Sequence, residues 1–212
     1  MMKKNLGPLT MMGFARYNSG EGVKAEELID ACLTWRQEFL EQQEGIAMHC
    51  FLGNLKGQFA DAIMAVDRAA FQEISKRHPE AKSSQSFMAL LDPNSVRLAA
   101  NEILKEGAKV PDDFSCIEFG TFNARQNVGF SETKMLQASR KVETEYLSRF
   151  PDSREHFMGR VDAETYSEIS FVQTLGAARE ICNGYLSNDV CKELLALMDV
   201  DTTEVEFWYV LA

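Results

Sequence analysis

Two short stretches that open alike decide the fold: Phe14-Ala-Arg-Tyr17-Asn18 and Phe119-Gly-Thr-Phe122-Asn123, which begin 105 positions apart. Further along the chain the offset is 107 positions, as if the second copy carried two extra loop residues. At that offset Phe71-Gln-Glu-Ile74 aligns with Ala178-Arg-Glu-Ile181, and Ser86–Asp92 aligns with Glu193–Asp199. Self-similarity at a fixed spacing indicates that one structural unit occurs twice in the chain.

The first copy has the order strand, helix, strand, strand, helix, strand. Apolar residues three and four positions apart predict a helix after the extended stretch at residues 10–17. The apolar positions of this helix are Leu28, Cys32, Trp35, Phe39 and Leu40. Strand-like stretches follow at residues 47–52 and 58–66. The next predicted elements are a helix with Asp67 as its N-cap and a short helix over residues 84–91. A last strand-like stretch ends near residue 104.

The second copy repeats this order. It predicts a strand over residues 115–122, a helix that begins at Ser131 as its N-cap, strands over 157–161 and 165–173, helices from about 174 and 187, and a closing strand over 204–211. Gly107 and Pro111 mark the stretch between the copies as a linker. We therefore expect repeat 1 at residues 1–104, a linker at 105–113 and repeat 2 at 114–212.

Each copy is a split βαβ unit, which is the ferredoxin-like βαββαβ arrangement. Such a unit forms a four-stranded sheet in the order 4-1-3-2, with both helices on one face and the other face bare. We expect an α+β protein whose tandem ferredoxin-like repeats pack sheet to sheet as an intramolecular α+β barrel.

This arrangement, over about residues 9–211, resembles the dimeric α+β-barrel superfamily, which includes antibiotic-biosynthesis monooxygenase-like, NIPSNAP-like and EthD-like proteins. In that superfamily two ferredoxin-like units enclose a cavity, and some members carry both units in one chain. The resemblance rests on topology and implies the fold and a ligand cavity. No catalytic residue is assigned from the resemblance, because the chain matches no short sequence signature of any subfamily.

Haem-dependent relatives place a ligating histidine on a helix that lines the cavity, whereas His156 stands at the start of a strand. Haem-degrading relatives have an asparagine on strand one and a histidine after helix two. Asn18 and His78 occupy such places, but the tryptophan expected beside them is missing. We expect no bound cofactor and no metal, although the sequence leaves haem binding open.

Composition excludes several classes of protein. The chain has 212 residues, of which 45% are hydrophobic, and a formal net charge of −10, so it lacks the basic face that nucleic-acid binding needs. We expect no membrane association, because no apolar run reaches the length of a membrane span. The start lacks the apolar core of a signal peptide, which favours a cytoplasmic location. Five cysteines without a Cys-x-x-Cys motif predict reduced thiols and neither a disulfide framework nor a zinc site.

Alternation along the strands predicts which residues share a face. We expect the more apolar sets to lie under the helices, and the polar and aromatic sets to face the opposite sheet. The sets expected under the helices include Ala60, Ala62, Met64, Ile169 and Phe171. The sets expected to line the cavity comprise Tyr17, Asp61, Glu118, Phe122, Arg160, Tyr166, Glu168, Glu206 and Trp208.

Glu118 and Glu168 are the candidate catalytic residues. Carboxylates crowded in a partly dry cavity repel one another, so at least one pKa should rise, and that group can then act as a general acid or base. Arg160 is suited to bind a substrate carboxylate. The alternative is structural: the charged side chains face water or pair with each other, and the aromatic side chains pack between the sheets.

Two classes of function follow. The first is a small-molecule-binding protein that acts as a cofactor-independent oxygenase on an apolar or aromatic substrate between the sheets. The second is a non-catalytic binding or interaction protein whose cavity is filled by its own side chains. In either class, exposed edge strands can pair two chains as a homodimer.

Overall fold

The computed structural model describes the whole chain, Met1–Ala212, except for the side chain of Asn127. The chain divides into two compact units. Unit 1 consists of Met1–Glu102, Glu106–Val110 and Val210–Ala212, and unit 2 consists of Ile103–Lys105 and Pro111–Tyr209.

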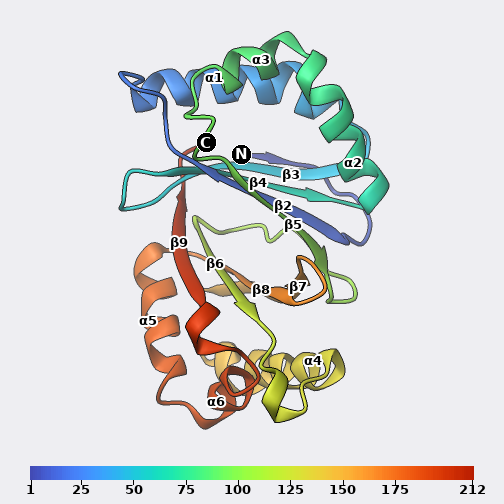
Figure 1. The fold of residues 1–212 in the computed structure, drawn as a ribbon, viewed down its shortest axis with the longest axis vertical. Helices are drawn as coiled ribbons and strands as arrows, with labels where there is room; N and C mark the ends of the chain where they lie inside the picture. Colours follow the sequence, from blue (N-terminus) through green and yellow to red (C-terminus); the bar gives the residue numbers. More distant parts are fainter. The chain divides into compact units, whose positions relative to one another are not determined.

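Unit 1 contains an antiparallel sheet with three helices on one face (Figure 1). Its strands run in the spatial order β1-β3-β4-β2-β5. The elements in chain order are β1 (Met2–Lys3), β2 (Met11–Tyr17), α1 (Ala25–Glu38), β3 (Ile46–Gly53), β4 (Phe59–Ala65), α2 (Arg68–Arg77), α3 (Lys82–Met88) and β5 (Arg97–Ile103).

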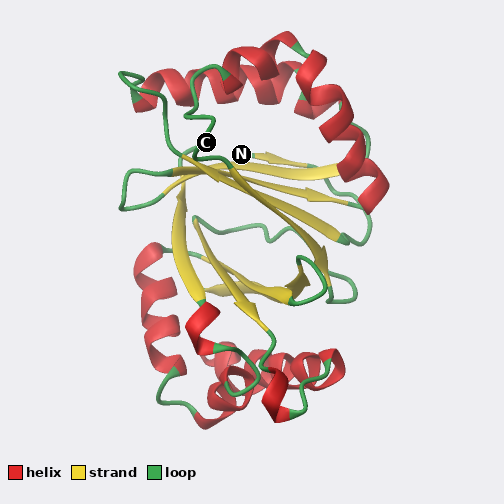
Figure 2. Cartoon of the chain, in the orientation of Figure 1, coloured by secondary structure: helices red, strands yellow, loops and turns green.

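Unit 2 has the same plan, with its helices again on one face of an antiparallel sheet (Figure 2). The strand order β7-β8-β6-β9 is the ferredoxin-like order expected from the sequence. The elements are β6 (Cys116–Asn123), α4 (Glu132–Lys141), β7 (Ser153–Arg160), β8 (Thr165–Val172), α5 (Leu175–Tyr185), α6 (Asp189–Leu195) and β9 (Glu204–Val210), and one π-helical turn covers Val142–Tyr146. The expected α+β class with tandem ferredoxin-like repeats is confirmed.

Short polar side chains set the beginnings of the helices. The Asp67 carboxylate accepts a hydrogen bond from the backbone N–H of Ala70 at 2.7 Å, and α2 follows. The Ser131 hydroxyl accepts one from the N–H of Lys134 at 3.2 Å at the start of α4. Both side chains satisfy backbone donors that have no partner within the helix, so both predicted N-caps are confirmed.

The assignment of strand faces is wrong for the first and third strands of both units. In unit 1, Tyr17 and Ile63 pack in one core cluster with Cys32 and Trp35 of α1. In unit 2, Phe122 and Tyr166 share a cluster with residues of α4 and α5. The side chains that we expected opposite the helices therefore lie beneath them.

The physical reason is that both faces of each sheet are buried. Ala60, Ala62 and Met64, which we expected under the helices, lie on the other face and are also fully buried. Alternation reveals which residues share a face, but it cannot reveal which of two buried faces the helices cover. On the last strand the assignment holds, since Phe207 packs against the helix-side core of unit 2.

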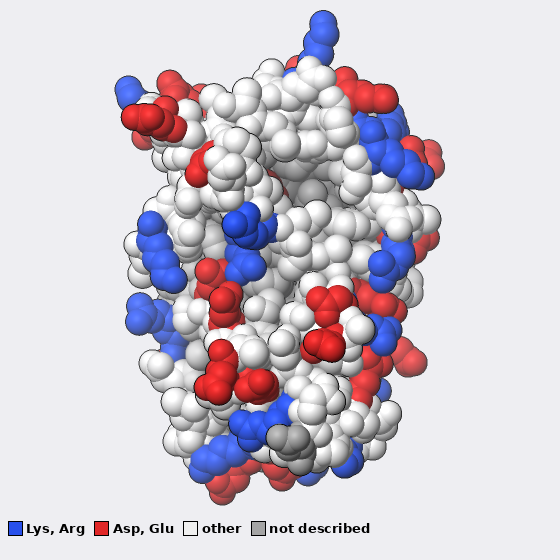
Figure 3. All heavy atoms as spheres, in the orientation of Figure 1, with Lys and Arg blue, Asp and Glu red and all other residues white. Residues whose placement is uncertain are grey.

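On the face of the molecule in Figure 3, acidic and basic side chains are interspersed. No helix in the described part of the chain is long and apolar enough to cross a membrane. The five cysteines are free thiols, of which four are buried and Cys182 is half-buried.

Candidate functional site

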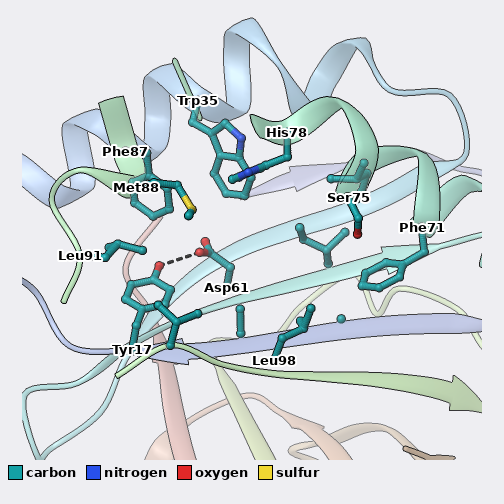
Figure 4. Close-up of a pocket in the computed structure, with 15 residues that line it drawn as sticks. Tyr17, Trp35, Asp61, Phe71, Ser75, His78, Phe87, Met88, Leu91 and Leu98 are labelled. Carbon is teal, nitrogen blue, oxygen red and sulfur yellow. Dashed lines mark hydrogen bonds between the residues drawn. The ribbon is translucent and has the colours of Figure 1, made fainter. Parts of the chain in front are cut away.

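A pocket of about 210 Å³ lies between the sheet of unit 1 and its three helices. Its wall is mostly apolar, and the side chains from the sheet and from the helices point toward one another across it (Figure 4). The lining residues are Gly13, Ala15, Tyr17, Trp35, Asp61, Ile63, Phe71, Ile74, Ser75, His78, Phe87, Met88, Leu91, Val96 and Leu98. The pocket is on the helix side of the sheet, not on the face where we expected a ligand.

Two small residues of β2 make room for this pocket. Gly13 has no side chain, and a Cβ atom built on it would lie 2.4 Å from the Phe71 ring of α2. The ring therefore lies directly against the backbone of β2. Ala15 is the next residue on that face, and it lies opposite Asp61 of β4 in the strand register.

Asp61 is the polar group of the sheet side of the pocket, and it is 4% exposed. The Tyr17 hydroxyl donates to its Oδ2 at 2.6 Å, and Nε2 of His49 lies 2.8 Å from its Oδ1. The Cys32 thiol of α1 lies 3.8 Å from the same Oδ1. Burial, and then the charge of Asp61, raise the pKa of Tyr17 well above its ordinary value, so the phenol stays protonated and donating.

His78 lies at the end of α2 on the helix side of the pocket, where burial lowers its pKa and so favours the neutral imidazole at neutral pH. Trp35 of α1 meets its ring edge-on, with the ring centroids 5.2 Å apart. From the sequence we expected no tryptophan beside this histidine, and that expectation is wrong. The two residues are 43 positions apart in the chain, and only the packing of α1 against α2 and α3 brings them together.

Unit 2 repeats the histidine–carboxylate pair of unit 1. Nε2 of His156 on β7 lies 2.9 Å from Oε1 of Glu168 on β8, as His49 of β3 pairs with Asp61 of β4. Both members of the pair follow the offset of 107 positions that relates the repeats. The sequence analysis missed this signal, which is an identical histidine and a chemically equivalent carboxylate at the same offset.

Glu118 and Glu168 lie together on the helix face of unit 2, where Tyr185 of α5 donates to Glu168 at 2.9 Å. Burial, followed by repulsion from Glu168, raises the pKa of Glu118 to about 8, so this carboxyl is largely protonated at neutral pH. Burial opposes the charge of His156, but the hydrogen bonds that its ring donates to Glu143 and Glu168 outweigh this effect and raise its pKa to about 9. These shifts favour a protonated Glu118 carboxyl group and a charged His156 ring at neutral pH.

The remaining predicted site residues do not form one group. Arg160 donates to Glu132 of α4 at 3.0 Å. Phe122 and Tyr166 belong to the helix-side core. Glu206 and Trp208 lie opposite Phe119 and Ile117 in the register of β9 with β6, which places them on the sheet face that Glu118 does not share. The structure thus brings Glu118 and Glu168 together and separates them from Glu206 and Trp208.

No family model and no curated protein sequence matches this chain. Solved structures match its fold over nearly the whole length. A ferredoxin-fold protein from Listeria monocytogenes, related to antibiotic-biosynthesis monooxygenases, is 12% identical, with 96% of each chain covered and a TM-score of 0.56. An anthrone oxidase-like protein is 11% identical, with 96% of this chain and 92% of that chain covered and a TM-score of 0.61. A haem-degrading enzyme from Listeria monocytogenes is 10% identical, with coverage of 94% and 98% and a TM-score of 0.52.

This protein therefore has the ferredoxin-like α+β fold of these structures, as the sequence indicated. The proteins with which it shares this fold include monooxygenase-like and haem-degrading proteins. At this level of identity the likeness establishes the fold, and the chemistry has to be argued from the residues of the chain.

Proposed function

We propose that the unit 1 pocket binds a small apolar or aromatic molecule and that the protein acts on it as a monooxygenase-like enzyme without a redox cofactor. The observation that carries this proposal is the pocket itself, an apolar cleft lined by a carboxylate of the sheet, Asp61, and by the imidazole of His78 at the end of α2. Apolar walls with a few placed polar groups are typical of small-molecule sites.

The two polar groups have distinct roles in this proposal. Asp61 is held by Tyr17 and His49, so it accepts a hydrogen bond from a ligand hydroxyl without reorienting. Neutral His78 can take a proton from an acidic C–H or O–H group of the ligand. Proton removal makes an aromatic ligand electron-rich enough to reduce dioxygen. In the net reaction a CH₂ group becomes a carbonyl, one oxygen atom stays in the product, and the other leaves as water.

A haem does not fit this pocket. Drug-sized ligands occupy pockets of roughly 300–1,000 Å³, and a haem is larger than most of them. The space next to His78 is about 210 Å³. We therefore assign no step to haem, and the pocket limits the ligand to a molecule much smaller than haem.

A specific observation supports a second candidate site. Hydrogen bonds connect Glu168 through His156 to Glu143, which lies at 3.3 Å from Nδ1 of that histidine. Glu143 and His156 also line a polar pocket of about 290 Å³ in unit 2. In this alternative, Glu118 and Glu168 supply the acid–base chemistry and the hydrogen-bonded chain moves the proton to that pocket.

The test uses anthrone as the probe, with tryptophan fluorescence, to which Trp35 of the pocket contributes, for binding and an oxygen electrode for turnover. We expect Ala15→Leu, which fills the pocket, to weaken binding at least about tenfold, and His78→Gln to slow oxygen uptake by a similar factor. The matched control is Ala69→Leu on the exposed side of α2. Unchanged binding in Ala15→Leu would exclude the unit 1 pocket. Turnover that is lost in Glu168→Gln but kept in His78→Gln would favour the site in unit 2.

A further inference from the structure

Three side chains with metal-binding atoms meet at the base of the unit 1 pocket. Cys32 comes from α1, His49 from β3 and Asp61 from β4, and all three are buried. One ligand atom from each lies within 4.8 Å of the other two. Elsewhere in the described part of the chain, no other trio of His, Cys, Asp or Glu residues meets this criterion.

We propose that Cys32, His49 and Asp61 form a binding site for a divalent cation of the zinc type. Thiolate, imidazole and carboxylate are the three ligand classes that Zn²⁺ takes, and catalytic zinc sites use three protein ligands with a fourth position open. This site shares Asp61 with the proposed organic-ligand pocket, but it needs no organic ligand to form.

The two distances from Asp61 lie within about half an ångström of those in a tetrahedral centre. With metal–ligand bonds near 2.0 Å for N and O and 2.3 Å for S, ligand atoms at tetrahedral angles are roughly 3.3–3.5 Å apart. Oδ1 of Asp61 lies 2.8 Å from His49 Nε2 and 3.8 Å from Cys32 Sγ. Moving the imidazole back and the thiol inward by about half an ångström each is enough to admit the ion.

Charge explains why such a site can exist in the interior. A thiolate, a carboxylate and a neutral imidazole carry two negative charges, and a divalent cation neutralises them. Buried charges are tolerated when they are paired or coordinate a metal. On binding, the Cys32 thiol proton is released to solvent and the thiolate becomes the ligand.

The surrounding groups orient the ligands. The Tyr17 hydroxyl donates to Oδ2 of Asp61, which leaves Oδ1 facing His49 and Cys32. Trp35 packs edge-on against the His49 ring, with 5.2 Å between the ring centroids. Hydrogen bonds such as that from Tyr17 to Asp61 fix the orientation of ligating carboxylates in metal sites. Asp61 and Tyr17 also line the pocket, so the pocket is the route by which an ion would reach the site.

Unit 2 offers an internal comparison. It has the same histidine–carboxylate pair, His156 with Glu168, but the partners there are Tyr185 and Glu143 rather than a thiol. The pair alone is therefore a feature of both repeats, and the cysteine distinguishes unit 1.

The experiment adds Co²⁺ to the reduced, metal-free full-length protein. We expect one equivalent to bind, with a thiolate-to-cobalt charge-transfer band in the near ultraviolet and the intense visible bands of a tetrahedral site, both removed by Zn²⁺. Cys32→Ser should abolish the charge-transfer band, whereas Cys191→Ser, a buried cysteine of unit 2, should keep it. Tyr17→Phe should weaken Zn²⁺ binding about tenfold.

Absence of the charge-transfer band in the wild-type protein would overturn the proposal, and so would its persistence in Cys32→Ser. Unfolding curves of the metal-free variants show whether Cys32→Ser folds. Should it not fold, His49→Gln is used instead; it keeps the thiolate but should weaken Co²⁺ binding at least about tenfold, and unchanged affinity would overturn the proposal. The cobalt experiment contains no organic ligand. A negative result would therefore overturn the metal site without testing whether the pocket binds anthrone, which is measured separately.

Discussion

His49 and His156 are equivalent residues, 107 positions apart, and each directs Nε2 at a carboxylate of the neighbouring strand, at 2.8 Å in unit 1 and 2.9 Å in unit 2. Both histidines are buried beneath the helices of their own unit. The repeat therefore preserves a polar pair inside each core. A tyrosine hydroxyl donates to the carboxylate in both units. The two environments differ because the Cys32 thiol lies beside Asp61 in unit 1, while Glu118 and Glu143 lie near the pair in unit 2.

The pKa of Glu118 makes stability depend on pH. Its carboxyl has a pKa raised to about 8 in the folded protein, so folding favours the protonated form. That contribution is present at pH 4 and is lost as the pH rises toward 8. We expect Glu118→Gln to be more stable than the wild type by about 1–3 kcal/mol at pH 8, with the difference vanishing near pH 4. Urea unfolding at the two pH values measures it. A large loss of stability at pH 8 would instead identify Glu118 as part of a stabilising ion pair.

His156 has the opposite pH dependence. Its pKa is raised to about 9, so its charged form contributes stability below pH 6.5, and this contribution is lost as the pH rises through 9. We expect His156→Gln to destabilise the protein by about 3 kcal/mol at pH 6 and by less at pH 10. Chemical unfolding across this range is the measurement. A pH-independent loss would mean that the ring contributes by packing alone.

Gly13 is needed for the contact between β2 and α2. Its missing side chain lets the Phe71 ring approach, and a Cβ would meet that ring at 2.4 Å. We expect Gly13→Ala to cost about 1–3 kcal/mol, because the ring must move within a packed core. Gly120 of β6 is the matched control, since its nearest contact would be an ordinary 3.6 Å. Equal unfolding midpoints for Gly13→Ala and Gly120→Ala would contradict this account.

The Tyr17–Asp61 hydrogen bond is buried and charge-assisted. We expect Tyr17→Phe to destabilise the protein by about 1–3 kcal/mol, because Asp61 loses one of its donors. A double-mutant cycle with Asp61→Asn measures the coupling between the two side chains. A coupling energy near zero would show that the hydroxyl does not support the carboxylate.

Local signals in the sequence were sufficient for the elements of the fold. The side chains of Asp67 and Ser131 cap helices because the backbone donors they satisfy are three residues away. The repeated order of elements then limits each unit to the ferredoxin-like topology, since sheet connections are short and follow a fixed handedness. The sequence also predicted that Glu118 and Glu168 lie close together, because they belong to neighbouring strands. They do so on the sheet face that the helices cover, and not on the face that we expected.

Tertiary structure alone decided which face of each sheet the helices cover, and with it the candidate site. Met64 and Asp61 are both buried, so alternation along β4 could not distinguish the two faces. Cys32, His49 and Trp35 meet near Asp61 only after α1 packs on the sheet, because they come from separate elements. A sequence determines periodicity and caps through contacts between near neighbours, whereas a site assembled from distant elements depends on how those elements pack.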